Sequence, residues 1–427
     1  MLKNIRNLFY DLDKILCILF ILIIPFLISG PFIPETLLSI CILIYLYINF
    51  KKKNFYYLNN IYIKIFFLWC AYLLFTSLIS DYVLLSLESS LFYFRFIFII
   101  LIISYLADNY KYFYKYLLTI LIMSYSILFL DSLIQYFNGE NILGFAYNGK
   151  RLSSLFGDEL VMGGYIARFL PMVLALLFYI YNDKAGPKIF ILITASAILV
   201  ALSGERTAIF LFLIIFLVFL IFIRNQLYLK LILTFSSVFI FAIILLNNNL
   251  LKERLIDHTY NQFSKLHTEK LVIFSKYHQY NLIISKNIFL DNIVFGIGPK
   301  NYREECKLYE IDNYCKICTC SMHPHNYLSQ VLSEVGILGA LAFLILFIYF
   351  IYQLIKYLFY SYFYKESNNI NYKLCLCLSA VINLFIFVPS GNLFNNWISI
   401  IIYINLSLGI YEFLLKHKNT NITKYRE

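Results

Sequence analysis

The stretch HPHNYLSQVLSEVGILGALAFLILFIYFIYQLI, residues 323–355, begins with two histidines around a proline and continues as one long apolar run. A helix needs roughly 20 apolar residues to cross a bilayer. The run 326–355 exceeds that length, so its first turns are expected to lie outside the hydrocarbon. The pattern predicts a transmembrane helix whose outer end begins at the histidines.

Eleven further stretches meet or approach the length of a span. With the run above, the predicted spans are 14–30, 36–50, 61–80, 90–107, 114–137, 159–181, 186–203, 206–223, 227–246, 326–355, 372–388 and 393–415. Only Gly204 and Glu205 separate the seventh from the eighth, which predicts a tight turn. We therefore predict an all-α integral membrane protein with about twelve transmembrane helices.

The composition supports this fold class. Hydrophobic residues make up 61% of the 427 residues, and only 14% are charged, whereas soluble domains are about 25% charged. Mean hydropathy is +0.75. The net charge of +11 would suggest nucleic acid for a soluble protein, but here it follows the positive-inside rule, so no nucleic-acid partner is expected. The run from about Lys14 to Gly30 lacks a small-residue cleavage site and is expected to be retained as the first span.

Lysine and arginine are distributed unevenly between the two sets of loops. With the N-terminus inside, the inner segments hold twenty of them, whereas the short outer loops and buried positions hold five. Because positive loops stay in the cytoplasm, both termini are expected to be cytoplasmic. The large segment 247–325 is then external, between membrane domains at 1–246 and 326–427. Its amphipathic stretches predict mostly short helices along the membrane surface.

Arginines stand out near the outer ends of the predicted spans. Arg151 lies in an external loop, and Arg206 follows the tight turn. Arginine near hydrocarbon usually pairs with an anion, and its planar fork matches phosphate oxygens, so the two side chains suit a diphosphate. The alternatives are an ion pair of Arg206 with Glu205, snorkelling, or an ordinary loop position for Arg151. Arg168, inside the sixth span, is either structural or supports the site.

The two histidines lie where the external segment returns to the membrane. Histidine is the side chain best suited to accept a proton near neutral pH. We expect Asn326 to cap the following helix and to hold His325 at a helix N-terminus. That position disfavours the charged ring, so its pKa is expected near or somewhat below 6.5. His323 has no such anchor in the sequence. The alternative interpretation is that both histidines only close a loop and take no part in catalysis.

A cluster of cysteines precedes the histidines. Cys306, Cys315, Cys318 and Cys320 lie in the external segment, where an oxidising compartment favours one or two disulfides. Zinc bound by these cysteines with His323 and His325 is the alternative; we expect no metal. Five other cysteines fall in spans and are expected to be inert: Cys17, Cys41, Cys70, Cys375 and Cys377.

The segment His325-Asn326, nine residues, then Gly336-Ile337-Leu338-Gly339 fits the pattern H-[NSQ]-x9-G-x-x-[GTY]. It resembles the signature of the O-antigen ligase family, which shares a membrane superfamily with the O-antigen polymerases. Twelve predicted spans, a large loop just before the motif, GIGPKNYR at 296–303 and SGER at 203–206 strengthen the resemblance.

The resemblance implies a metal- and cofactor-independent, inverting glycosyltransferase at the periplasmic face of a bacterial inner membrane. Its donor would be a glycan on undecaprenyl diphosphate, and its acceptor a sugar hydroxyl of lipid A-core. The implied roles are His325 as base, Arg206 and Arg151 as diphosphate ligands with Arg254 and Arg303 as further candidates, and Asn326, His323, Gly336 and Gly339 as supporting residues.

Three other functions remain open from the sequence. An O-antigen polymerase would use the same donor and extend the lipid-linked glycan. A polysaccharide transporter or flippase would place its polar residues near the bilayer midplane, whereas here they gather at one outer face. A metal-binding sensor would need zinc at the cysteines.

Overall fold

The computed structural model describes residues 2–222, 227–264, 274–311, 318–363 and 368–416. Within these ranges the protein is helical, and the β structure consists of one isolated bridge between Glu140 and Ala146. The predicted all-α class is therefore confirmed.

Ten segments of the described residues are long and apolar enough to cross a membrane. They are Asp11–Ser29 within α1 (Leu2–Phe26) and η1 (Leu27–Ser29), α2 (Phe32–Lys52), α3 (Ile61–Leu78), Val83–Asn109 formed by α4 (Val83–Ser90) and α5 (Arg95–Asn109), α6 (Phe113–Asn138), α7 (Met162–Tyr181), α8 (Gly186–Ser203), Lys230–Asn247 within α10 (Leu227–Asn247), α15 (Tyr327–Phe363), and Asn396–Leu415 formed by α17 (Asn396–Ile410) and η7 (Tyr411–Leu415).

Every predicted span coincides with a helix, but two of the twelve are short. α9 (Arg206–Phe222) begins directly after the predicted Gly204-Glu205 turn and has 17 residues. α16 (Asn368–Asn383) has 16 residues and ends before the predicted boundary at 388. Residues 384–395 instead form a loop, which we call the 384–395 loop. Several of its backbone groups form hydrogen bonds with the start of α15.

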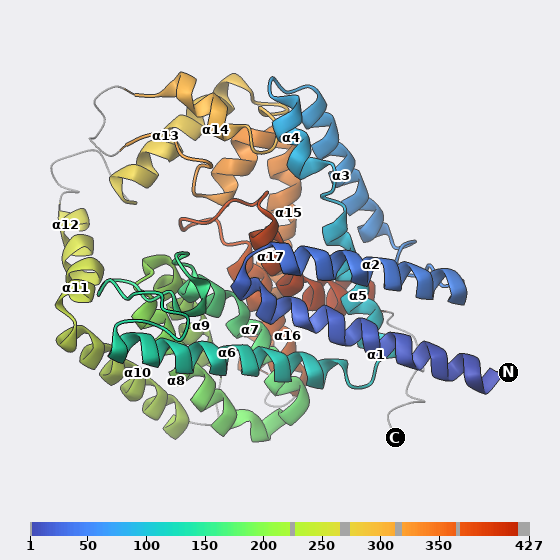
Figure 1. The fold of residues 1–427 in the computed structure, drawn as a ribbon, viewed down its shortest axis with the longest axis horizontal. Helices are drawn as coiled ribbons and strands as arrows, with labels where there is room; N and C mark the ends of the chain where they lie inside the picture. Colours follow the sequence, from blue (N-terminus) through green and yellow to red (C-terminus); the bar gives the residue numbers. More distant parts are fainter. Residues whose placement is uncertain (1, 223–226, 265–273, 312–317, 364–367, 417–427) are drawn as a thin grey trace.

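α7 forms the centre of the helical assembly. Its residues from Tyr165 to Leu177 are all buried, and it packs against α16, α8, α9 and α6 (Figure 1). α10, by contrast, exposes Phe235, Val238 and Phe239. A helix that is apolar on its exposed faces is expected in lipid rather than in water.

The polar contacts at one end of the assembly join the predicted inner segments. Lys52 pairs with Asp13 at 3.4 Å, and Lys373 pairs with Glu412 at 3.5 Å. The hydroxyl of Tyr56 donates to the carbonyl of Leu415. Loops that the charge pattern places on one side therefore contact one another.

The segment after α10 contains short helices, as predicted. They are α11 (Asn249–Lys252), the π-helical turn η4 (Glu253–Asp257), α12 (His258–Ser264), α13 (Lys276–Asp291), α14 (Tyr302–Glu305) and η6 (Cys306–Tyr309). α11 and α12 continue from α10, whereas α13 and α14 both pack against α15 (Figure 1). A small separate core of Tyr280, Ile284, Ile288 and Tyr302 holds α13 and α14 together.

The predicted disulfide bonding is confirmed for two of the external cysteines. Cys306 is bonded to Cys320, with 5.8 Å between their Cα atoms. Cys318 is also disulfide-bonded, and Cys315 lies outside the described residues. The five cysteines expected to be inert are buried free thiols.

Gly336 interrupts α15 with φ 69° and ψ −171°. The loop before α14 docks at this kink: Gly298 N donates to Glu334 O at 2.7 Å, and Ile337 N donates to Ile293 O at 2.8 Å. A Cβ at Gly336 would lie 2.3 Å from the carbonyl oxygen of Val294. The kink thus separates the first turns of α15, next to the histidines, from the long apolar part.

Candidate functional site

His325 occupies a tight turn directly before α15. Its φ of 58° lies in the left-handed region, which is costly for a residue other than glycine and persists only where the surroundings hold it. The amide of Ser390 in the 384–395 loop donates to the carbonyl of His325 at 2.8 Å. The side chain is half-buried, so part of the ring is accessible to a substrate.

Asn326 caps α15, as predicted, because its Oδ1 accepts from the amide of Ser329 at 3.0 Å. Its Nδ2 also donates to the carbonyls of Ile386 at 2.6 Å and Val388 at 3.3 Å. One turn later, Gln330 bonds to Asn392 in the same loop at 2.7 Å. Gln330 Oε1 also accepts from the amide of Leu393 at 2.9 Å. Side chains of α15 thus pair with backbone groups of the 384–395 loop, which makes no helix there.

His323 is anchored after all, contrary to the expectation from sequence. Its Nε2 lies 3.3 Å from the carbonyl oxygen of Ser390. A carbonyl only accepts, so the proton of the neutral ring must be on Nε2. The ring centroid lies 4.1 Å from that of His325. Sequence reasoning missed this anchor because Ser390 belongs to a loop more than sixty residues away.

A third histidine, His278, completes the cluster. It comes from the first turn of α13, which Ser275 caps through the amide of His278. Its ring centroid is 4.9 Å from that of His325, and its Nδ1 is buried with no hydrogen-bond partner among the described residues. No local signal in the sequence indicates this placement, since His278 lies within an ordinary amphipathic stretch.

All three rings are held in the neutral form. Burial, followed by the neighbouring histidines, lowers the pKa of His325 to about 3. Burial lowers the pKa of His323 to about 4, against the opposing effect of the Ser390 carbonyl. Burial and then the Arg206 guanidinium lower the pKa of His278. The pKa of His325 was expected near or somewhat below 6.5 because of a helix N-terminus; its direction agrees, but the shift is larger and burial is its largest cause.

Arg151, Arg206 and Arg254 gather around the SGER turn. Gly204 has φ +61°, and a Cβ there would lie 2.4 Å from the carbonyl oxygen of Lys150. The Gly204 carbonyl accepts from Arg254 Nε at 3.0 Å. Arg151 and Arg206 both depress the pKa of Arg254, after burial. Three arginines from separate segments are thus brought together beside His278, and Arg206 is exposed.

Arg303 lies apart from these three. Its guanidinium depresses the pKa of His323 and of Lys300, whereas the charges that shift Arg254 are those of Arg151, Arg206 and Glu205. The Nε of Arg303 is buried without a partner among the described residues. Arg303 thus acts on His323, whereas Arg206 acts on His278.

Glu205 lies beneath the arginines. Its Oε1 accepts from the amide of Gly163 at 2.8 Å and lies 4.0 Å from Arg151 Nη2. Burial raises the pKa of Glu205 to about 7, against the opposing effects of Arg151, the Gly163 amide and Arg168. Arg168 itself is 6% exposed, and its guanidinium carbon lies 5.8 Å from the ring centre of Tyr327. It thus lies in α7 against the first residue of α15.

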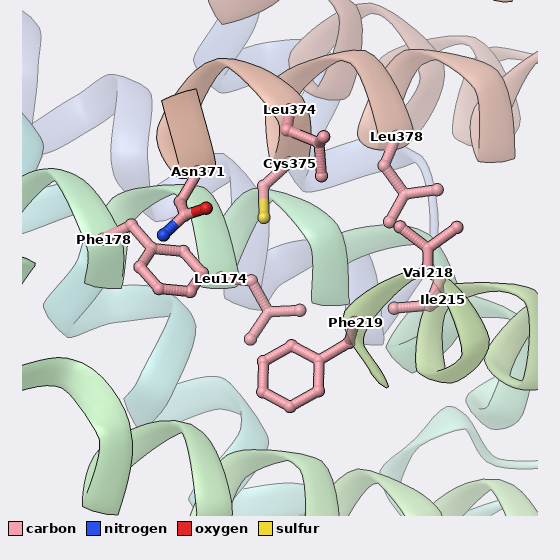
Figure 2. A pocket seen from close by; sticks show the side chains of 9 residues that line it. All are labelled: Leu174, Phe178, Ile215, Val218, Phe219, Asn371, Leu374, Cys375 and Leu378. Atoms are coloured by element: carbon pink, nitrogen blue, oxygen red, sulfur yellow. The ribbon is translucent and has the colours of Figure 1, made fainter. Parts of the chain in front are cut away.

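Among the residues that the structure describes, an apolar pocket lies away from the predicted site residues. No group of three or more His, Cys, Asp or Glu among these described residues is placed to hold a metal ion. An apolar pocket between α7, α9 and α16 is shown in Figure 2, with Leu174, Phe219 and Leu378 in its lining. None of the predicted site residues lines it, so it has no part in proton transfer.

The comparison with protein families agrees with the motif. The family model described as O-antigen ligase matches residues 189–344. This range contains the SGER turn, the segment of short helices and the whole His325 motif. The resemblance to the O-antigen ligase family is thereby confirmed, and a function of the O-antigen ligase or polymerase type is supported. No curated protein matches the chain.

Proposed function

We propose that this protein is an O-antigen ligase. It moves a glycan from undecaprenyl diphosphate to a sugar hydroxyl of lipid A-core at the periplasmic face of the bacterial inner membrane, with both termini in the cytoplasm. The observation that carries this proposal is the placement of His325 in a tight turn directly before α15, with its ring 4.9 Å from that of His278, whose pKa the Arg206 guanidinium lowers.

The proposed reaction is a single displacement at the anomeric carbon. His325 removes the proton of the acceptor hydroxyl. The hydroxyl oxygen then bonds to the anomeric carbon, and the bond from that carbon to the diphosphate oxygen breaks. The configuration inverts because the nucleophile enters opposite the leaving group.

The arginine group stabilises the charge that develops on the leaving diphosphate. Arg206 is exposed for contact with the ligand, and Arg151 and Arg254 are fixed by the SGER turn. Planar guanidinium groups bind phosphate oxygens in pairs, and a group that is fixed before the reaction needs no reorganisation during it.

Deletion of the protein in its native organism tests the proposal. Loss of all O-antigen glycan from lipid A-core, with polymer accumulating on undecaprenyl diphosphate, supports a ligase. A core that carries a single glycan unit assigns the protein as a polymerase instead, because the first unit is then still transferred. Unchanged lipopolysaccharide contradicts both.

A further inference from the structure

His325 is the middle ring of the three histidines. His323 contacts it on one side, at 4.1 Å between ring centroids, and His278 on the other, at 4.9 Å. Tyr277, next to His278 on α13, lies 5.6 Å from the same ring. The Arg206 guanidinium lowers the pKa of His278, so His278 has the proposed base on one hand, at 4.9 Å between ring centroids, and the charge of the arginine group within reach.

The proposed reaction creates a proton that has to leave His325. The ring is half-buried and has a second imidazole on each side, so a lasting positive charge is unfavourable there. The leaving diphosphate at the same moment gains negative charge and becomes a proton acceptor. A group between the two shortens the path that this proton has to travel.

Of the two neighbours, His278 is the one free to carry the proton. The Nε2 of His323 is occupied by the carbonyl of Ser390. The Nδ1 of His278 is buried without a partner among the described residues. An unpaired buried nitrogen is unfavourable in the substrate-free protein, and a role in transfer gives it a partner during the reaction.

We propose that His278 is a second catalytic residue, which relays the proton from His325 to the leaving undecaprenyl diphosphate. The inference rests on the proposed function. The proton passes from the acceptor hydroxyl to His325, then to His278 and then to a terminal phosphate oxygen, while the glycan passes from that diphosphate to the acceptor oxygen. Both histidines return to the neutral state, and no other reactant is consumed.

The test is a transfer assay with the full chain in proteoliposomes, with an undecaprenyl-diphosphate glycan as donor and lipid A-core as acceptor. We expect His278→Ala and His278→Gln to lower kcat by about 10- to 100-fold, because a positioned proton carrier is lost. The KM for the donor should change by less than about threefold, because the arginines remain. Imidazole in the buffer should restore much of the activity of His278→Ala.

A matched histidine variant controls for general effects. His258 lies on α12, is exposed, and pairs with Glu253 at 3.7 Å; His258→Ala should transfer at the wild-type rate. If His278→Ala does not fold, His278→Gln carries the same comparison of kcat with donor KM.

The outcomes separate the relay from the proposed function. Full turnover in a folded His278 variant overturns the relay alone. A rise in donor KM at unchanged kcat, or a loss that imidazole does not relieve, also overturns it and makes His278 a donor ligand or a structural residue. Absence of transfer by the wild-type protein overturns the proposed function and the relay with it.

Discussion

The carbonyl of His325 accepts a 2.8 Å hydrogen bond from the amide of Ser390. The proposed base is therefore held by two separate parts of the chain, the start of α15 and the 384–395 loop. Asn326 ties the same two parts together through the carbonyls of Ile386 and Val388. Such anchoring keeps a strained backbone turn in place and limits the movement of the ring.

Removal of the proposed base should abolish most of the activity. We expect His325→Ala to reduce kcat by roughly 10²- to 10⁴-fold, the usual contribution of a positioned base, while the donor still binds. His323→Ala should be milder, because His323 supports the ring of His325 rather than taking the proton. Transfer assays on both variants decide this, and a severe loss confined to His323→Ala would identify His323 as the base.

The pH dependence of kcat/KM should be flat between about pH 5 and 8. A general base acts in its neutral form, which dominates above its pKa, and burial with His323 and His278 nearby lowers that pKa to about 3. The rate should therefore rise with pH only in the acidic range. A rate profile in wild-type proteoliposomes tests this, and a midpoint near 6.5 would mean that the ring is hydrated rather than buried.

The same lowered pKa values should make the fold sensitive to acid. In the unfolded chain these histidines bind protons below about pH 6.5, whereas the folded pKa values of His323 and His325 are about 4 and 3. Their contribution to stability is complete above pH 6.5 and is lost as the pH falls towards 3. Tm should fall between pH 7 and 5, and the fall should be smaller in His325→Ala; equal slopes would contradict the burial.

Loss of an arginine from the SGER turn should affect the donor. Arg206→Ala should abolish transfer without loss of expression, because the diphosphate loses a forked cation. Arg206→Lys should recover only part of the activity, since a point charge replaces the fork. Arg303→Ala should change donor KM far less, because Arg303 lies beside His323. Similar donor KM values for wild type and Arg206→Ala would remove Arg206 from the diphosphate site.

The kink in α15 should tolerate no side chain. Gly336→Ala would place an alanine at a φ of 69°, which is strained for that residue, and its Cβ would lie 2.3 Å from the Val294 carbonyl oxygen. We therefore expect the free energy of unfolding to fall by about 3 kcal/mol or more. Gly139→Ala is the matched control: its φ is also positive, at 84°, but nothing lies within 4 Å. The control should lose about 1 kcal/mol. Thermal unfolding of both in detergent gives the comparison, and equal Tm shifts would show that the kink relaxes.

The sequence by itself determined the helices and the motif. Apolar runs of about 20 residues leave few options other than transmembrane helices, and a helix was found at each of the twelve predicted runs. The cap at Asn326, the turn at Gly204 and the presence of a disulfide among the external cysteines were also readable, although the pairing of Cys306 with Cys320 was not. Each depends on residues close together in the chain, so local chemistry suffices to predict it.

Tertiary structure alone decided what surrounds the base. His278 reaches His325 from α13, and Ser390 anchors His323 from a loop more than sixty residues further along the chain. The tertiary structure also sets Arg303 near His323, whereas Arg151, Arg206 and Arg254 lie near one another. Burial sets the pKa of His325, and burial is a sum over neighbours from distant segments. A single sequence specifies such contacts only through the whole fold, because their spacing along the chain has no period or motif.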